Sequence, residues 1–155
     1  MNNSCFFTGH RVIPADKRNE IKKAVMLHCI NLIDNCGVTD FIAGGALGFD
    51  TLAALTVLKM KEKYPNIRLH LYLPFTDQAS SWSMYNRTLW EYIREHADDY
   101  RYITNNTYVA GCMQKRNRAM VDNAKFCIAY CTNFKSGTGY TISYAKKCGR
   151  IVKLI

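Results

Sequence analysis

The chain has 155 residues and a formal net charge of +9, and 48% of its residues are hydrophobic and 21% are charged. This length and composition predict one ordinary globular domain, residues 1–155. The sequence contains no run of 18 apolar residues and begins without a basic, apolar leader. These features exclude a spanning helix and predict a cytoplasmic protein with no membrane partner.

The positive charge is concentrated in the last third of the chain. Residues 111–155 carry a net charge of +8, with Asp122 as their one acid, whereas residues 1–110 contribute +1. A basic segment of this kind indicates an anionic partner, either a phosphate-bearing small molecule or nucleic acid. The alternative is a solvated basic face that keeps the protein soluble.

The cysteines predict neither a metal site nor a disulfide framework. There are seven of them, an odd number, and they lack paired C-x-x-C spacing. Buried reduced thiols are the expected state, because a zinc site needs a tighter cluster with histidines at ligand spacing. The sequence assigns no cofactor.

In the first half of the chain, apolar runs alternate with helical patterns. The first strand is predicted at residues 4–8, and a helix that Asp16 caps runs to about residue 35. A second strand at residues 41–43 leads into a helix at residues 47–64, and a third strand spans residues 67–73.

The second half continues the alternation. In chain order we expect a helix at residues 81–97, a short strand at 100–103, a basic helix at 112–123, a buried strand at 125–130, a small-residue loop at 132–139, a helix at 141–148 and a final strand at 150–155. Strict alternation predicts an α/β fold with right-handed crossovers. The expected architecture is a Rossmann-like, doubly wound, mainly parallel sheet of about six strands with helices on both faces.

Three glycine-rich or polar loops each follow a predicted strand, at residues 8–11, 44–50 and 132–139. In a doubly wound sheet, ligands bind beyond the carboxyl ends of the strands. We therefore expect these loops to meet in one composite pocket for a nucleotide-like ligand.

The loop G-G-A-L-G-F-D at residues 44–50 joins a strand to a helix N-terminus. Its backbone N–H groups and the helix dipole suit a phosphate, although a tight turn packed against the sheet is the alternative. Asp50 either accepts a hydrogen bond from a ribose hydroxyl or caps the helix. In the first loop, Gly9 permits the turn while His10 and Arg11 can reach a phosphate or a base.

Further candidates come from the rest of the chain. Arg116 or Arg118 can point at the pocket, but not both, because residues two apart diverge on a helix. Gln78, Trp82 and Tyr85 either form an aromatic wall over a base or ribose or pack in the core. No catalytic residue is assigned. The candidate ligand-binding residues are Thr8, Gly9, His10, Arg11, Gly44, Gly45, Ala46, Gly48, Asp50, Gln78, Trp82, Arg116, Asn117, Ser136, Gly137, Thr138 and Gly139.

The motifs F-F-T-G-H-R, G-G-A-L-G-F-D, L-P-F with Gln78 and Trp82, R-N-R-A-M-V-D and S-G-T-G follow one another along the chain. This ordered set resembles the YpsA-like (DUF1273) proteins of the SLOG superfamily, which is related to the LOG phosphoribohydrolases and to DNA-processing protein A. The resemblance implies a Rossmann-like fold and the binding or sensing of a nucleotide-derived ligand, of the ADP-ribose, NAD or nucleoside phosphate type.

The same resemblance leaves enzymatic activity open. The LOG enzymes carry an Arg-Lys pair and a P-G-G-x-G-T-x-x-E loop, and this sequence has Arg116 at the arginine but Asn117 at the lysine and Thr141 at the glutamate. Nucleotide N-glycosidase activity is therefore the second alternative, with Asp50 as the substitute carboxylate. The first alternative is single-stranded DNA binding, as in DNA-processing protein A. A homo-oligomer is also left open.

Overall fold

One parallel sheet organises the molecule, which is a computed structural model that describes residues 1–104 and 108–155. Its six strands in these residues lie in the order β4-β3-β2-β1-β5-β6, and every described pairing is parallel. The strands are β1 (Ser4–Gly9), β2 (Asp40–Ala43), β3 (Arg68–Leu73), β4 (Asp99–Tyr102), β5 (Phe126–Tyr130) and β6 (Ile151–Leu154).

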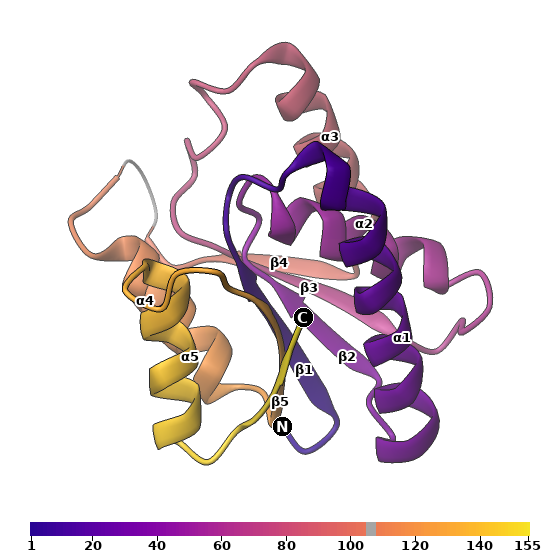
Figure 1. Cartoon of the computed structure of the whole chain (residues 1–155). Coiled ribbons are helices and arrows are strands. Elements are labelled where there is room, and N and C mark those ends of the chain that lie inside the picture. The colour runs from indigo at the N-terminus through magenta and orange to yellow at the C-terminus, as the bar shows by residue number, and fades with distance from the viewer. Residues whose placement is uncertain (105–107) are drawn as a thin grey trace.

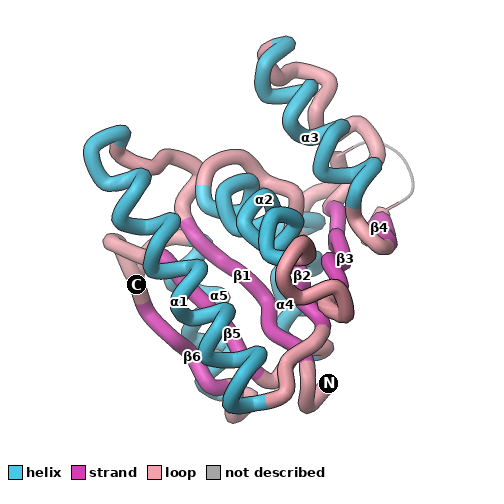
Figure 2. Tube along the Cα trace, turned by 90° about the vertical axis from the view of Figure 1, so that its right-hand side faces the viewer, coloured by secondary structure: helices cyan, strands magenta, loops and turns pink. Residues whose placement is uncertain are grey.

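Helices cover both faces of the sheet. Figures 1 and 2 show α1 and α2 on one side of the sheet and α4 and α5 on the other. The helices are α1 (Arg18–Cys36), α2 (Phe49–Met60), α3 (Met84–His96), α4 (Cys112–Asp122) and α5 (Gly137–Lys147), and a short 3-10 helix, η1 (Ala15–Lys17), precedes α1. The predicted doubly wound α/β fold is confirmed.

The strand order reverses at β1. The chain moves outward from β1 through β2, β3 and β4, and then returns to place β5 on the free side of β1. Phe6 of β1 is paired with Ile42 of β2 and with Cys127 of β5. This switch point leaves the carboxyl ends of β1 and β5 side by side, which is where ligands bind in such sheets.

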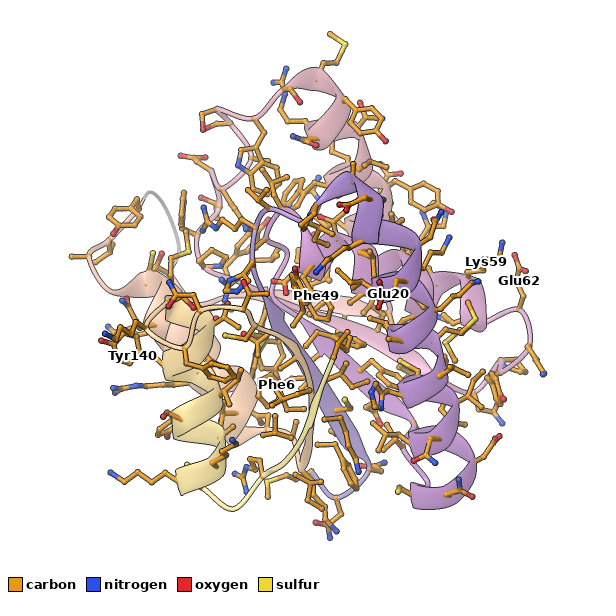
Figure 3. The ribbon with its side chains drawn as sticks, viewed as in Figure 1. Phe6, Glu20, Phe49, Lys59, Glu62 and Tyr140 are labelled. Atoms are coloured by element: carbon orange, nitrogen blue, oxygen red, sulfur yellow. The ribbon has the colours of Figure 1, made fainter. Side chains whose placement is uncertain are left out.

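Alternating side chains of β1 divide the core between the two faces. Phe7 packs with Phe41 and Phe49 on the α1–α2 side, with ring centroids 5.9 and 6.4 Å apart, whereas Phe6 belongs to the cluster on the α4–α5 side. Figure 3 shows Phe6 and Phe49 in these layers. Strand residues alternate in direction, and a sheet buried on both faces therefore needs nearly continuous apolar strands.

Several predicted helix ends are wrong, for local reasons. Asp16 does not cap α1, since it lies within η1, and α1 follows Lys17 without a side-chain cap in the described residues. Helix α2 begins at Phe49 because Gly48 has φ of 76°, outside the helical region. Helix α5 begins four residues earlier than expected, because Ser136 caps it.

Two further structural findings bear on the predictions. Of the helices in the described residues, none is long and apolar enough to cross a membrane. The cysteines are free thiols, as expected, but they are not uniformly buried: Cys36 is exposed, whereas Cys5, Cys29, Cys112 and Cys127 are buried.

Candidate functional site

A cavity of about 260 Å³ opens at the switch point of the sheet. It lies where the loops after β1, β2 and β5 meet the inner face of α4 and the first turn of α5. Its lining residues are Thr8, Gly9, His10, Arg11, Ala46, Asp50, Met113, Arg116, Asn117, Met120, Ser136, Gly137 and Thr138. The structure thus brings together residues of all three strand-end loops, and we refer to this space as the strand-end cavity.

The glycines of the loop after β2 shape its path rather than line the cavity. Gly48 needs its positive φ of 76°, and a side chain there would collide with the carbonyl of Arg11. The Phe49 N–H donates to His10 O at 3.0 Å, which joins this loop to the loop after β1. The tight-turn interpretation therefore accounts for Gly48, while Ala46 and Asp50 of the same loop reach the cavity.

Gly44 makes room for the two charged groups of the cavity. A Cβ atom at this position would lie 2.6 Å from Arg116 Nη1 and 2.8 Å from Asp50 Oδ2. The guanidinium uses this space to donate from Nη1 to Gly44 O, and its Nε donates to Asn117 Oδ1 at 2.8 Å. The side chain of Arg116 is therefore held against the loop after β2.

Arg116 is a buried charge, with 5% of its surface exposed. In the part of the chain that the structure describes, the ion pairs within 4.0 Å do not include it. Burial lowers the pKa of Arg116, and repulsion from the Arg11 guanidinium adds to this effect, while Asp50 opposes it. An arginine stays protonated in proteins, so the cavity holds a positive charge that is incompletely compensated.

Asp50 is the carboxylate of the cavity. It lies in the first turn of α2, and its Oδ2 accepts a hydrogen bond from Ala46 N at 3.3 Å. Burial raises the pKa of Asp50, and the attraction of Arg116 only partly offsets this rise. Buried carboxyl groups with raised pKa values are typical of functional clefts, although structural networks also produce them.

The N-terminus of α5 provides backbone donors on the opposite wall. Ser136 Oγ accepts a hydrogen bond from Gly139 N at 3.2 Å and donates to Asn133 O at 2.6 Å. The first N–H groups of a helix have no intrahelical partner, and here Gly137 and Thr138 carry them at the cavity lining. Together with the helix dipole they form a site that suits an anion.

His10 and Arg11 form the outer part of the lining. The Thr132 N–H donates to His10 Nε2 at 2.8 Å, which assigns the imidazole proton to Nδ1 and ties the loop after β1 to the loop after β5. Arg11 is exposed, and its guanidinium reaches Met113 Sδ at 3.9 Å. Arg11 thus borders the cavity from the solvent side.

Four other candidates, Gly45, Gln78, Trp82 and Gly139, are not among the described residues that line the strand-end cavity. Gln78 is buried, and its Nε2 donates to Gly45 O at 3.0 Å. Trp82 packs edge-on against Trp90 at 6.5 Å. For Gln78 and Trp82 the core-packing alternative describes their placement better.

The basic helix presents one arginine to the cavity, as its spacing predicts. Arg118 is exposed, and its guanidinium lies 5.5 Å from the ring centroid of Tyr144. Sequence reasoning missed two residues of the lining, Met113 and Met120. They are three residues before and four after Arg116, so the helical period places them on the same face. Among the described residues, no group of His, Cys, Asp or Glu is arranged to hold a metal ion.

Comparisons with known proteins agree with the family resemblance. The model of the YpsA family, described as the YspA SLOG family, matches residues 10–150. A UPF0398 protein from Bacillus cereus is 31% identical over 133 residues, which cover 84% of this chain and 72% of that protein. The SPbeta prophage-derived protein YoqJ of Bacillus subtilis is 34% identical over 119 residues, 69% of each chain.

Solved structures show the same fold. DNA processing protein A from Streptococcus pneumoniae superposes with a TM-score of 0.73 at 18% identity, over 97% of this chain and 49% of that one. The Helicobacter pylori protein, whose structure concerns a single-stranded DNA binding mode, gives a TM-score of 0.70 at 17% identity, over 99% of this chain and 65% of that one. This chain thus spans about half to two thirds of those proteins. The family match and the UPF0398 relatives show that the chain belongs to the YpsA family of the SLOG superfamily.

Proposed function

We propose that the chain binds a nucleotide-derived ligand, of the ADP-ribose, NAD or nucleoside phosphate type, in the strand-end cavity. In this proposal the phosphate lies between the Gly137 and Thr138 N–H groups and the guanidinium groups of Arg11 and Arg116. The ribose lies toward Asp50, whose carboxylate accepts a hydrogen bond from a ribose hydroxyl and would repel the phosphate. The family membership is compatible with such a ligand without naming it.

The observation that carries the proposal is the buried charge of Arg116. Removing an ion from water costs several kcal/mol unless hydrogen bonds and an opposite charge compensate it. Arg116 has two hydrogen bonds and the attraction of Asp50, but burial still lowers its pKa and Arg11 repels it. A phosphate between the two guanidinium groups would relieve that repulsion and supply bidentate acceptors.

The composition of the site favours binding over cleavage. Thr141 stands where the resemblance to the LOG enzymes puts a glutamate, and its hydroxyl donates to Gly137 O at 3.0 Å within the helix. Asp50 is therefore the carboxylate that a glycosidase mechanism would have to use. Release of free base from nucleoside monophosphates tests that alternative, and a rate above the Asp50→Asn variant would establish it.

Thermal unfolding in the presence of ligands tests the proposed function. Adenosine 5′-monophosphate, ADP-ribose and NAD are added to the wild-type protein and to the Arg116→Lys and Arg11→Gln variants. A ligand at 100 times its Kd stabilises the fold by about 2.7 kcal/mol. We expect at least one of the three compounds to raise Tm, and both variants to reduce the rise.

Lys115→Gln is the matched control, because Lys115 is exposed on α4, next to Arg116, and does not line the cavity. It removes one positive charge, as Arg11→Gln does, and should leave the ligand-induced rise unchanged. The proposal is wrong if none of the compounds raises the Tm of the wild-type protein. It is also wrong if Lys115→Gln reduces the rise as much as Arg11→Gln, since the effect would then be one of net charge.

A second candidate function is single-stranded DNA binding. The observation that favours it is a set of exposed cations on and around α4 and α5: Lys115, Arg118, Lys135, Lys146 and Lys147. Binding by such a surface should weaken steeply as salt rises, with a slope set by the number of phosphates contacted. Titration of a labelled oligonucleotide at two salt concentrations tests it, and no binding at low salt would exclude it.

A further inference from the structure

A second cavity adjoins the strand-end cavity in the groove between α4 and α5. It has a volume of about 300 Å³, and Asn117 and Gly137 line both spaces. The strand-end cavity alone is about 260 Å³, just below the usual range for a site that encloses a complete ligand. A nucleotide whose phosphate and ribose fill the first space must place its base elsewhere, and the adjoining groove is open to it.

The groove is walled by aromatic and planar groups. Tyr140 and Tyr144 are one turn apart on the same face of α5, and both line it together with Arg118 of α4. Tyr140 is 71% exposed, and Figure 3 shows it on the outer side of the α4–α5 layer. A large ring that stays in solvent on the rim of a cavity is available for stacking.

Its neighbours are held in place. Tyr144 Oη donates to Asp122 Oδ1 at 2.9 Å, and the Arg118 guanidinium lies over the Tyr144 ring at 5.5 Å from the centroid. Asn117 Oδ1 accepts a hydrogen bond from Arg116 Nε, so the side-chain amide N–H groups of Asn117 are the donors that it can offer to a ligand. The groove therefore combines a free ring, a fixed ring under a cation, and an oriented amide.

We infer that this groove binds the nucleobase of the ligand, with Tyr140 as the stacking residue. The inference rests on the proposed function, because the phosphate subsite must be occupied for the base to reach the groove. Stacking on aromatic side chains and on guanidinium planes is the usual way in which proteins hold an unpaired base. This inference puts the aromatic wall on α5 instead of at Gln78, Trp82 and Tyr85, which the sequence offered as one of two alternatives.

Calorimetric titration with two probes tests the inference. Adenosine 5′-monophosphate carries a base, whereas ribose 5-phosphate has the same sugar and phosphate without it. We expect the wild-type protein to bind the nucleotide at least about tenfold more tightly, which equals about 1.4 kcal/mol. Tyr140→Ala should remove most of that advantage and leave the affinity for ribose 5-phosphate unchanged.

Tyr85→Ala is the matched control. Tyr85 is 72% exposed and also lies in the first turn of a helix, but it belongs to α3. It should leave both affinities unchanged. The inference is wrong if Tyr85→Ala weakens nucleotide binding instead, if Tyr140→Ala has no effect, or if it weakens both probes equally, as a general structural change would.

The outcomes separate the two proposals. Equal affinities for the two probes in the wild-type protein would contradict the base subsite while supporting the phosphate site. If neither probe binds, the base subsite is contradicted, and the phosphate site is contradicted as well if ADP-ribose and NAD leave Tm unchanged. A deoxythymidine octamer could also bind more tightly than the mononucleotide and bind more weakly to Tyr140→Ala than to the wild type. That result would overturn the assignment to a small ligand and identify the groove as a binding site for single-stranded DNA.

Discussion

Replacing Gly44 with alanine should destabilise the protein through the strand-end cavity. The added Cβ would lie 2.6 Å from Arg116 Nη1, 2.8 Å from Asp50 Oδ2 and 2.9 Å from Arg116 Cζ, and it cannot be accommodated unless these groups move. Gly44 is not among the glycines with positive φ in the described chain, so the backbone itself tolerates alanine. In the folded state the effect is therefore steric displacement, while the unfolded chain loses some conformational freedom, as it does for any Gly→Ala change.

The size of the loss in stability follows from the hydrogen bond that is broken. Moving the guanidinium breaks the hydrogen bond from Arg116 Nη1 to Gly44 O, and a hydrogen bond to a charged group contributes about 1.5–3 kcal/mol. At about 2–4 °C per kcal/mol for a chain of this size, a loss of ~2 kcal/mol lowers Tm by roughly 4–8 °C. Denaturant titration would give the free energy of unfolding, and circular dichroism on heating would give Tm.

Gly137→Ala is the control for this prediction. Gly137 lines the cavity, but a Cβ there would meet nothing within 4 Å. Its free energy of unfolding should stay within about 0.5 kcal/mol of the wild-type value, as for substitutions that create no clash. If Gly44→Ala is as stable as Gly137→Ala, Arg116 and Asp50 do not occupy the space beside Gly44, and our description of the site is wrong.

Three other predictions concern the pH dependence of stability, the buried carboxylate and the core. Burial lowers the pKa of His70, but its hydrogen bonds to Asp40 and Asp99, at 2.7 and 2.8 Å, outweigh this effect and raise the pKa above 6.5. The stabilisation from protonated His70 is therefore complete below pH 6.5 and is lost as pH rises through the pKa of the folded protein. Tm should fall over that range, and His70→Gln should abolish the fall. A Tm that falls equally in both proteins would contradict this role. Because burial raises the pKa of Asp50, the stabilisation from its protonated form is complete below pH 3.8 and is lost as pH rises through the pKa of the folded protein. Asp50→Asn should therefore be at least as stable as the wild type at pH 7. A lower Tm of this variant would refute the reasoning. Phe49 is fully buried against Phe7 and Tyr130, so Phe49→Ala should cost about 3–5 kcal/mol in denaturant unfolding, and a loss below 1 kcal/mol would show that the core is not packed as described.

The fold could be predicted from the sequence because its signals are local. Each apolar run is short, is bounded by glycine, proline or charge, and alternates with a helical pattern, and this order implies a parallel sheet. The start of α5 was missed because S-G-T-G has low helix propensity, and the cap that Ser136 provides outweighs it. A similar cap by Ser83 places the start of α3 at Met84 rather than at residue 81.

The site was only partly predictable. Convergence of the three loops follows from topology, since the carboxyl ends of parallel strands share one edge. The choice of Arg116 over Arg118 depends on how α4 is rotated against the sheet, which the pattern of charges does not determine. The role of Gly44 depends on Arg116, 72 residues away in the chain. Gln78 likewise donates a hydrogen bond to Gly45 O, 33 residues away, and no local motif predicts this contact.

The most direct test of the account is an amide chemical-shift titration of the ¹⁵N-labelled protein with adenosine 5′-monophosphate. If the phosphate binds in the strand-end cavity, the Gly137 and Thr138 amide signals and the Arg116 Nε signal should shift together and saturate with one Kd. The amide signals of β4 and of the C-terminal end of α1 should stay unchanged. Absence of any saturable shift, or shifts confined to surfaces away from the cavity, would contradict the claim that this cavity is a phosphate-binding site.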